Sequence, residues 1–157
     1  NSSTVGVDLN TTTTGVQFGL GTVVKGSNNS EWVYGVATAA LTTGMIVGIL
    51  TAGTAVALSQ ASASQTAQMI GVANGAFAAG DYGWFCTRGV GVTVAISASG
   101  TLNAVLYVAS STPGYLSTTA GTATLAGVEI LAAATTASQT TTTAVLTWPR
   151  ALGTGLG

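Results

Sequence analysis

The residues with the most chemical potential lie in one short stretch, residues 80–97, which reads GDYGWFCTRGVGVTVAIS. It contains the chain's single cysteine, Cys86, with Asp81 before it and Arg88 after it. A cysteine nucleophile needs a neighbouring base, most often histidine, and the chain has no histidine. A cysteine that faces inward from a strand behaves mainly as a small apolar side chain. We therefore predict that Cys86 is buried and that the protein is not an enzyme.

Other kinds of site lack the residues that they need. The chain has four carboxylates, with no spacing typical of the facing pair of a glycosidase; they are Asp8, Glu31, Asp81 and Glu129. One cysteine, no histidine and no calcium-type loop predict that no metal or other cofactor is bound. The glycine-rich segment 19–26 lacks the spacing and the Lys-Ser/Thr ending of a phosphate-binding loop. Three basic residues are too few for nucleic acid, so no nucleic-acid partner is expected; they are Lys25, Arg88 and Arg150.

Aromatic residues form the remaining candidate site. They are Trp32, Tyr34, Tyr82, Trp84, Phe85 and Trp148. If exposed together, such rings could stack on sugars, whereas buried rings anchor a small β core or a subunit interface without a charge cost. We favour the second interpretation, with Trp32, Tyr34 and Trp84 as the hypothetical anchors of an oligomer interface.

Alternation with a period of two is the commonest pattern in the chain, and it predicts strands. Val90, Val92, Val94 and Ile96 would share one face, with smaller or polar residues on the other. The same pattern predicts strands at 5–9, 16–20, 32–36 and 144–148, separated by glycine-containing turns. Asn74-Gly75 favours a tight type I′ hairpin. The single helix candidate is 60–69, so the fold class is all-β, a compact barrel or sandwich.

Composition predicts an assembly rather than a membrane protein. Only 4% of the residues are charged and the net charge is −1, so copies of the chain repel one another little. We expect self-association as a homotrimer. Segment 36–58 is uncharged and long enough to span a membrane, but Thr and Gly break it and it lacks basic flanks, so we expect no membrane partner.

The length suits one domain. We expect an N-terminal arm with the first strands over 1–30, a barrel over 31–150 and a tail over 151–157. In the extended arm, Val5, Val7 and Leu9 alternate and could fill pockets on one face of a partner's sheet edge.

Four segments in order carry a resemblance to a known family: MIGVANGAF, AAGDYGWFCTRGVGVTV, LYVASSTPGYLS and AGVEILAAATTASQTTTTAVLTWPR. This order, which spans roughly residues 31–150, resembles head decoration or cement proteins of tailed bacteriophages, which have a β-barrel or β-tulip body.

The resemblance implies a non-enzymatic virion protein, made in the host cytoplasm, that sits on the outer capsid surface, commonly as a trimer. It would stabilise the capsid by bridging subunits of the major capsid protein, with the arm at 3–14 adding to the capsid's own sheet. The alternative is a carbohydrate-binding fibre or adhesin domain of a virion, in which the aromatic residues would be exposed.

Overall fold

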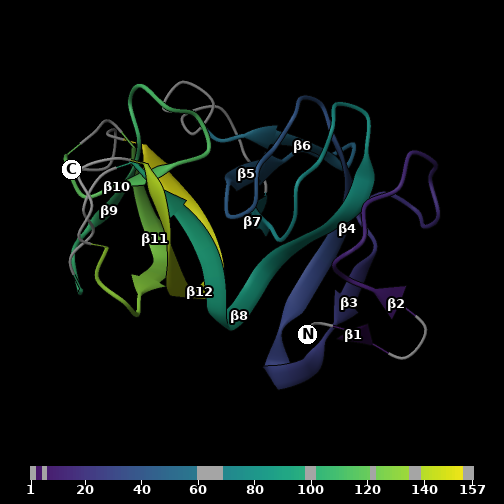
Figure 1. Cartoon of the computed structure of the whole chain (residues 1–157), viewed down its shortest axis with the longest axis horizontal. Coiled ribbons are helices and arrows are strands. Elements are labelled where there is room, and N and C mark those ends of the chain that lie inside the picture. The colour runs from purple at the N-terminus through teal and green to yellow at the C-terminus, as the bar shows by residue number, and fades with distance from the viewer. Residues whose placement is uncertain are drawn as a thin grey trace.

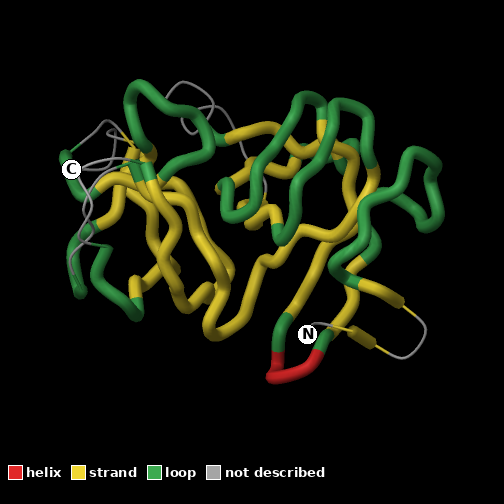
Figure 2. Tube along the Cα trace, in the orientation of Figure 1, coloured by secondary structure: helices red, strands yellow, loops and turns green. Residues whose placement is uncertain are grey.

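The computed structural model describes residues 3–4, 7–59, 69–97, 102–120, 123–134 and 139–153. Within these ranges the regular structure is β-strand apart from one 3-10 turn, η1 (Ser27–Asn29), which confirms the all-β prediction (Figure 2). The strands are β1 (Ser3–Thr4), β2 (Val7–Asp8), β3 (Val23–Lys25), β4 (Glu31–Ala37), β5 (Ile46–Ile49), β6 (Thr54–Ala57), β7 (Met69–Ala73), β8 (Tyr82–Ile96), β9 (Leu106–Val108), β10 (Leu116–Ser117), β11 (Ala123–Ile130) and β12 (Thr140–Gly153). Apart from Met69, the helix candidate at 60–69 lies outside the described residues.

Two closed rings of strands share β8, the longest strand. In the first ring β8 pairs with β7, β7 with β5, β5 with β6, β6 with β4, and β4 returns to β8. In the second ring β8 pairs with β12, β12 with β11, β11 with β9, β9 with β10, and β10 returns to β8. We call these rings the first and second barrel. Figure 1 shows them side by side, with β8 running from one into the other.

β8 bends where it passes between the barrels. The ladder between β4 and β8 shifts register at Thr87, and the ladder between β12 and β8 shifts at Gly91, where φ is +73°. Such bulges add a residue to one strand and bend it. Arg88, Gly89 and Val90 therefore lie between two bulges. Figure 1 shows that β8 bends between the two barrels.

The second bulge explains an error in the sequence-based pattern. Val94 and Ile96 are fully buried as expected, but Val90 is 68% exposed. An extra residue at Gly91 reverses the direction in which the side chains before it point, so Val90 faces solvent. The alternation was therefore right only for the part of the strand after the bulge.

Buried side chains join the two barrels into one body. One hydrophobic cluster, which includes Val33, Val47 and Phe85, contains no residue of β9–β12. A larger cluster contains residues of both barrels, among them Trp84 of the first and Leu106 of the second. The two barrels thus pack against each other across apolar surface.

Backbone hydrogen bonds also connect the barrels. The N–H of Gly44 donates to the carbonyl of Ala73 at 2.8 Å, and the carbonyl of Gly44 accepts from the N–H of Ala95 at 2.8 Å. The N–H of Ile46 donates to the carbonyl of Gly114 at 2.8 Å. Ala73 and Ile46 belong to the first barrel, whereas Ala95 lies in the part of β8 that pairs with β12, and Gly114 lies between β9 and β10.

Three local predictions were wrong. Residues 16–20 form no strand. Asn74 and Gly75 are absent from the positive-φ residues that a type I′ turn requires, and residues 74–81 join β7 to β8 as a longer loop. The tail expected to start at 151 instead continues β12 as far as Gly153, where it pairs with Ala123 of β11.

Candidate functional site

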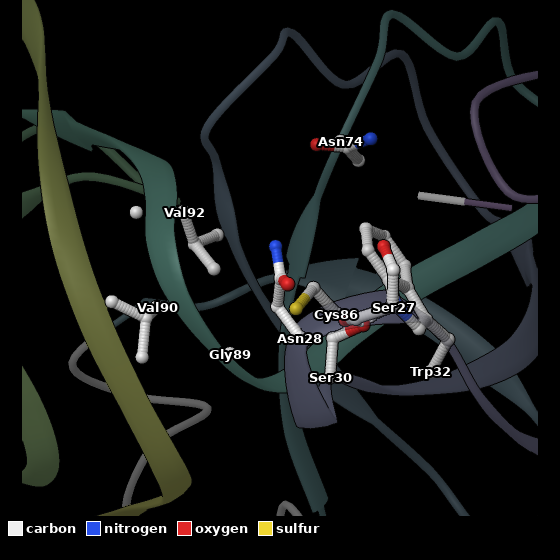
Figure 3. Close-up of a pocket in the computed structure, with 10 residues that line it drawn as sticks. Ser27, Asn28, Ser30, Trp32, Asn74, Cys86, Gly89, Val90 and Val92 are labelled. Atoms are coloured by element: carbon white, nitrogen blue, oxygen red, sulfur yellow. Dashed lines mark hydrogen bonds between the residues drawn. The ribbon is translucent and has the colours of Figure 1, made fainter. Parts of the chain in front are cut away.

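A hollow of about 160 Å³ lies beside Cys86, and Figure 3 shows the side chains that line it. Its polar groups largely bond one another: the indole N–H of Trp32 donates to Ser30 Oγ at 2.9 Å, and the Ser30 hydroxyl donates to the carbonyl of Ser27 at 2.8 Å. The thiol of Cys86 donates to the carbonyl of Arg88 at 3.2 Å. These bonds occupy the indole N–H of Trp32, the hydroxyl of Ser30 and the thiol of Cys86.

Cys86 is fully buried, as predicted. Burial raises the pKa of the Cys86 thiol from 9.0 to about 12, because desolvation disfavours the thiolate and outweighs the opposing effect of a backbone hydrogen bond at Arg88. Since the thiolate is the reactive form, this position suits a structural cysteine rather than a nucleophile.

The described part of the N-terminal segment packs on its own body, which corrects the hypothesis of a free arm. Leu9 is 1% exposed and belongs to the larger core cluster, and Val7 packs partly buried against that cluster. Thr13 and Tyr82 exchange two backbone hydrogen bonds of 2.7 and 2.9 Å. Val5 lies outside the described residues. Leu9 therefore cannot supply the capsid contact proposed for it, because it already fills the protein's own core, and part of Val7 is taken up in the same way.

Aromatic contacts hold the same segment in place. The ring of Phe18 lies 5.2 Å from that of Tyr34 in an edge-to-face arrangement and 5.3 Å from that of Trp84. The N–H of Gln17 donates to the Tyr34 hydroxyl at 3.0 Å. Asp8 caps the turn that follows β2, because its carboxylate accepts from Thr11 and from the Asn10 backbone, and these bonds lower its pKa.

We expect the change Leu9→Ala to reduce the free energy of unfolding by about 2–5 kcal/mol, because it leaves a cavity among buried side chains. Val16→Ala is the matched control, since Val16 belongs to the same segment but is 62% exposed and should change stability by no more than about 0.5 kcal/mol. Urea denaturation measures both. Equal and small effects would mean that the segment is not part of the folded body.

The three aromatic residues proposed for an oligomer interface are also corrected. Trp32, Tyr34 and Trp84 are between 2% and 3% exposed and belong to the core cluster that joins the barrels. Side chains with so little exposed area cannot anchor a second copy of the chain. Their burial agrees with the other role considered for them, as anchors of a β core.

A different group of residues gathers at the bend of β8. The guanidinium of Arg88 lies 4.5 Å from the centre of the Trp148 ring, and the indole N–H of Trp148 donates to Glu31 Oε1 at 3.0 Å. Glu31 and Arg88 are register partners on β4 and β8, and Lys25 on β3 is the next partner of Glu31. Three of the chain's seven charged residues therefore share one row across neighbouring strands.

Two adjoining hollows flank β12 at this row. One, of about 150 Å³, is lined by residues that include Asn28, Arg88 and Val90. The other, of about 250 Å³, is lined by residues that include Gly127 and Glu129. Both share Val145 and Thr147. We call the two hollows with Arg88 and Trp148 the Arg88 groove.

Backbone geometry beside the groove is unusual. Among the described residues other than glycine, four have positive φ, and three of them lie here: Asn28 (54°), Asn29 (59°) and Trp148 (48°). Asn tolerates this region, but for a bulky residue it is a clear outlier. Trp148 is nevertheless 51% exposed, so core packing does not account for its position. Strained residues of this type cluster at functional sites.

Sequence patterns had named Arg88, Glu31 and Trp148 separately but gave no reason to combine them. They come from β8, β4 and β12, and only the ring closure brings these strands together. One signal was available, because charged residues are so rare in this chain that each exposed one is informative. The Arg88 groove is the best candidate functional site.

Within the described ranges, no group of three or more His, Cys, Asp or Glu residues could hold a metal ion. No helix in that part of the chain is long and apolar enough to cross a membrane. No family model, curated protein or solved structure matches the chain.

Proposed function

We propose that the protein is a non-enzymatic structural protein of a bacteriophage virion. In this role it decorates the outer surface of the capsid, as a homotrimer, and stabilises the shell by bridging subunits of the major capsid protein. The resemblance of residues 31–150 to capsid decoration proteins supports the viral context. The buried, weakly acidic thiol of Cys86 in a chain without histidine supports a role without catalysis.

The observation that carries this proposal is the surface of the folded body. Several large apolar side chains are exposed on a protein with very few charges. They include Val16, Val23, Val90, Leu152 and Trp148. Where such side chains gather they are typical contacts of protein interfaces, and Val90 and Trp148 both lie at the Arg88 groove. Because the described N-terminal segment is packed down, contact with the shell is assigned to this outer surface rather than to the arm.

One observation favours a second candidate, carbohydrate binding by a fibre or adhesin domain. Trp148 exposes half of its surface, and sugars stack on exposed indole rings. The guanidinium of Arg88 already covers one face of that ring, however, which leaves one face for a sugar. A glycan array with wild-type protein and Trp148→Ala distinguishes this candidate: specific glycan binding that the change abolishes would favour it.

Re-addition to shells tests the main proposal. Purified protein is mixed at micromolar concentration with capsids prepared without it, and bound copies are counted after sedimentation. We expect saturable binding at a copy number comparable to that of the capsid protein, and a higher temperature of shell opening. Empty particles of an unrelated phage serve as the control. No binding to the matching shells, or equal binding to both kinds, would reject the proposal.

A further inference from the structure

The geometry points to the Arg88 groove as a binding site for a carboxylate, supplied by a Glu or Asp side chain on the surface of the partner protein. This inference rests on the proposed function in one respect, namely that the partner is a subunit of the viral shell. The chemistry of the groove itself depends only on the residues of this chain.

The guanidinium of Arg88 has hydrogen-bond donors to offer a ligand. Arg88 is half-buried, and its side chain contacts the Trp148 ring. In the part of the chain that the structure describes, the guanidinium donates no hydrogen bond. A guanidinium carries five N–H donors in a planar fork that matches the two oxygens of a carboxylate. The Trp148 ring contacts the guanidinium and leaves its donors available.

Charge favours an anion in the hollow that Arg88 lines. Of the described residues, Arg88 is the one charged residue that lines this hollow, whereas Glu129 lines the neighbouring hollow. Glu31 is a carboxylate of this chain that could compete with a ligand for Arg88. Its Oε1 already accepts the indole N–H of Trp148 at 3.0 Å, which reduces that competition. Trp148 therefore contacts both groups, since its ring lies against the Arg88 guanidinium and its indole N–H holds the Glu31 carboxylate.

The apolar residues around Arg88 indicate a protein partner. Val90 is exposed beside the guanidinium, and Val145, its register partner on β12, lies half-buried in the same hollow. Arginine and tryptophan with an apolar surround are the residues enriched where protein interfaces bind most strongly. The exposed turn at Asn28 and Asn29 adds amides at the rim that can bond a partner's backbone.

The conformation of Trp148 supplies an independent argument. The strain at φ +48° would be relieved by glycine, and the residue that follows is Pro149. Gly127 on β11 leaves the space that this backbone needs, because a Cβ there would lie 2.7 Å from the carbonyl of Thr147. The strained backbone thus carries an exposed ring that contacts Arg88 and Glu31, which is the arrangement expected of a binding site.

Nuclear magnetic resonance of the isolated protein tests the chemistry without a shell. The chain has two arginines, so the Nε–H signal of Arg150 is an internal control for that of Arg88. The probe is N-acetyl-glutamate amide, and the control compound is N-acetyl-glutamine amide. We expect the Arg88 signal to shift with saturation at millimolar glutamate probe, and Arg150 to shift much less. Parallel shifts of both arginines, or none, would overturn the carboxylate site.

Shell binding by variants tests the partner. Arg88→Lys keeps the charge but loses the planar fork, and we expect it to weaken binding at least tenfold, whereas Arg150→Lys should bind like wild type. Trp148→Gly relieves the backbone strain, so we expect it to unfold at the urea concentration that unfolds wild type, or at a higher one. Because it also removes the ring, we expect it to bind shells at least tenfold more weakly.

These outcomes separate the inference from the proposed function. Wild-type protein that shows the Arg88 shift but does not bind shells would reject the shell as partner and leave the carboxylate site standing. Wild-type protein that binds shells while Arg88→Lys and Trp148→Gly bind equally well would overturn the groove as the docking site. If Trp148→Gly instead unfolds much more readily than wild type, Trp148 is a structural brace between the barrels and the argument from strain fails.

Discussion

The change Gly44→Ala is expected to lower the free energy of unfolding by about 3 kcal/mol or more. Gly44 has φ +88°, a region in which a side chain costs about 1–2 kcal/mol. A Cβ there would also lie 2.9 Å from the backbone nitrogen of Ala95 and 3.1 Å from the carbonyl carbon of Val94. Both atoms belong to β8, which cannot move aside without disturbing both barrels. The close approach allows Gly44 to join Ala73 to Ala95 through two hydrogen bonds.

Gly91→Ala is the matched control. Gly91 also has positive φ, at +73°, but a Cβ there would meet nothing within 4 Å. The control therefore isolates the conformational cost, about 1–2 kcal/mol. Urea denaturation of the two variants and wild type gives the comparison. Equal losses in both variants would show that the contact between Gly44 and β8 is looser than the structure has it.

The second large effect concerns the reactivity of Cys86. At pH 8 we expect iodoacetamide to modify the native thiol roughly a thousandfold more slowly than the thiol of the unfolded chain. The reason is that a pKa of about 12, against 9.0, reduces the thiolate fraction by that factor when the pH is below both values. Because Cys86 is the single cysteine, mass spectrometry of the intact protein follows the reaction directly.

The same pKa shift predicts how stability depends on pH. A thiol whose pKa is raised in the folded state contributes stability that is fully present below pH 9 and is lost as the pH rises from 9 towards 12. Cys86→Ser should lack this component of the alkaline loss of stability, because a serine hydroxyl does not ionise in that range.

In the labelling experiment, a rate of iodoacetamide modification in the native protein within tenfold of the rate in the unfolded chain would contradict the burial of the Cys86 thiol.

Much of the fold could be predicted from alternation alone. The strand around Trp32 and Tyr34, the buried Cys86 and the all-β class follow from local sequence, because side chains on successive strand residues point to opposite faces. The order in which strands close into rings does not, since it depends on pairings between distant segments. The β4–β6 and β8–β10 pairs that complete the barrels are parallel, and no turn signal marks such a pair.

The candidate site was the least predictable part. Bulges at Thr87 and Gly91 flank Arg88 and Val90, and Val90 is exposed although the alternation predicted that it is buried. Glycines on either side of Val90 were the local signal for this irregularity. The left-handed backbone at Trp148 depends on Gly127 across the strand pair, a requirement that the sequence near Trp148 does not reveal.

The shared strand also sets the order in which the protein can be completed during synthesis. Every strand of the first barrel, including the part of β8 that pairs with β4, has left the ribosome once residue 88 has emerged. At that moment β9, β10, β11 and β12 are still inside the ribosome or not yet synthesised. The first barrel can therefore close on the nascent chain. The remaining half of β8 then extends from a folded barrel when β12 emerges to pair with it, so the second barrel assembles against a strand that is already held in place.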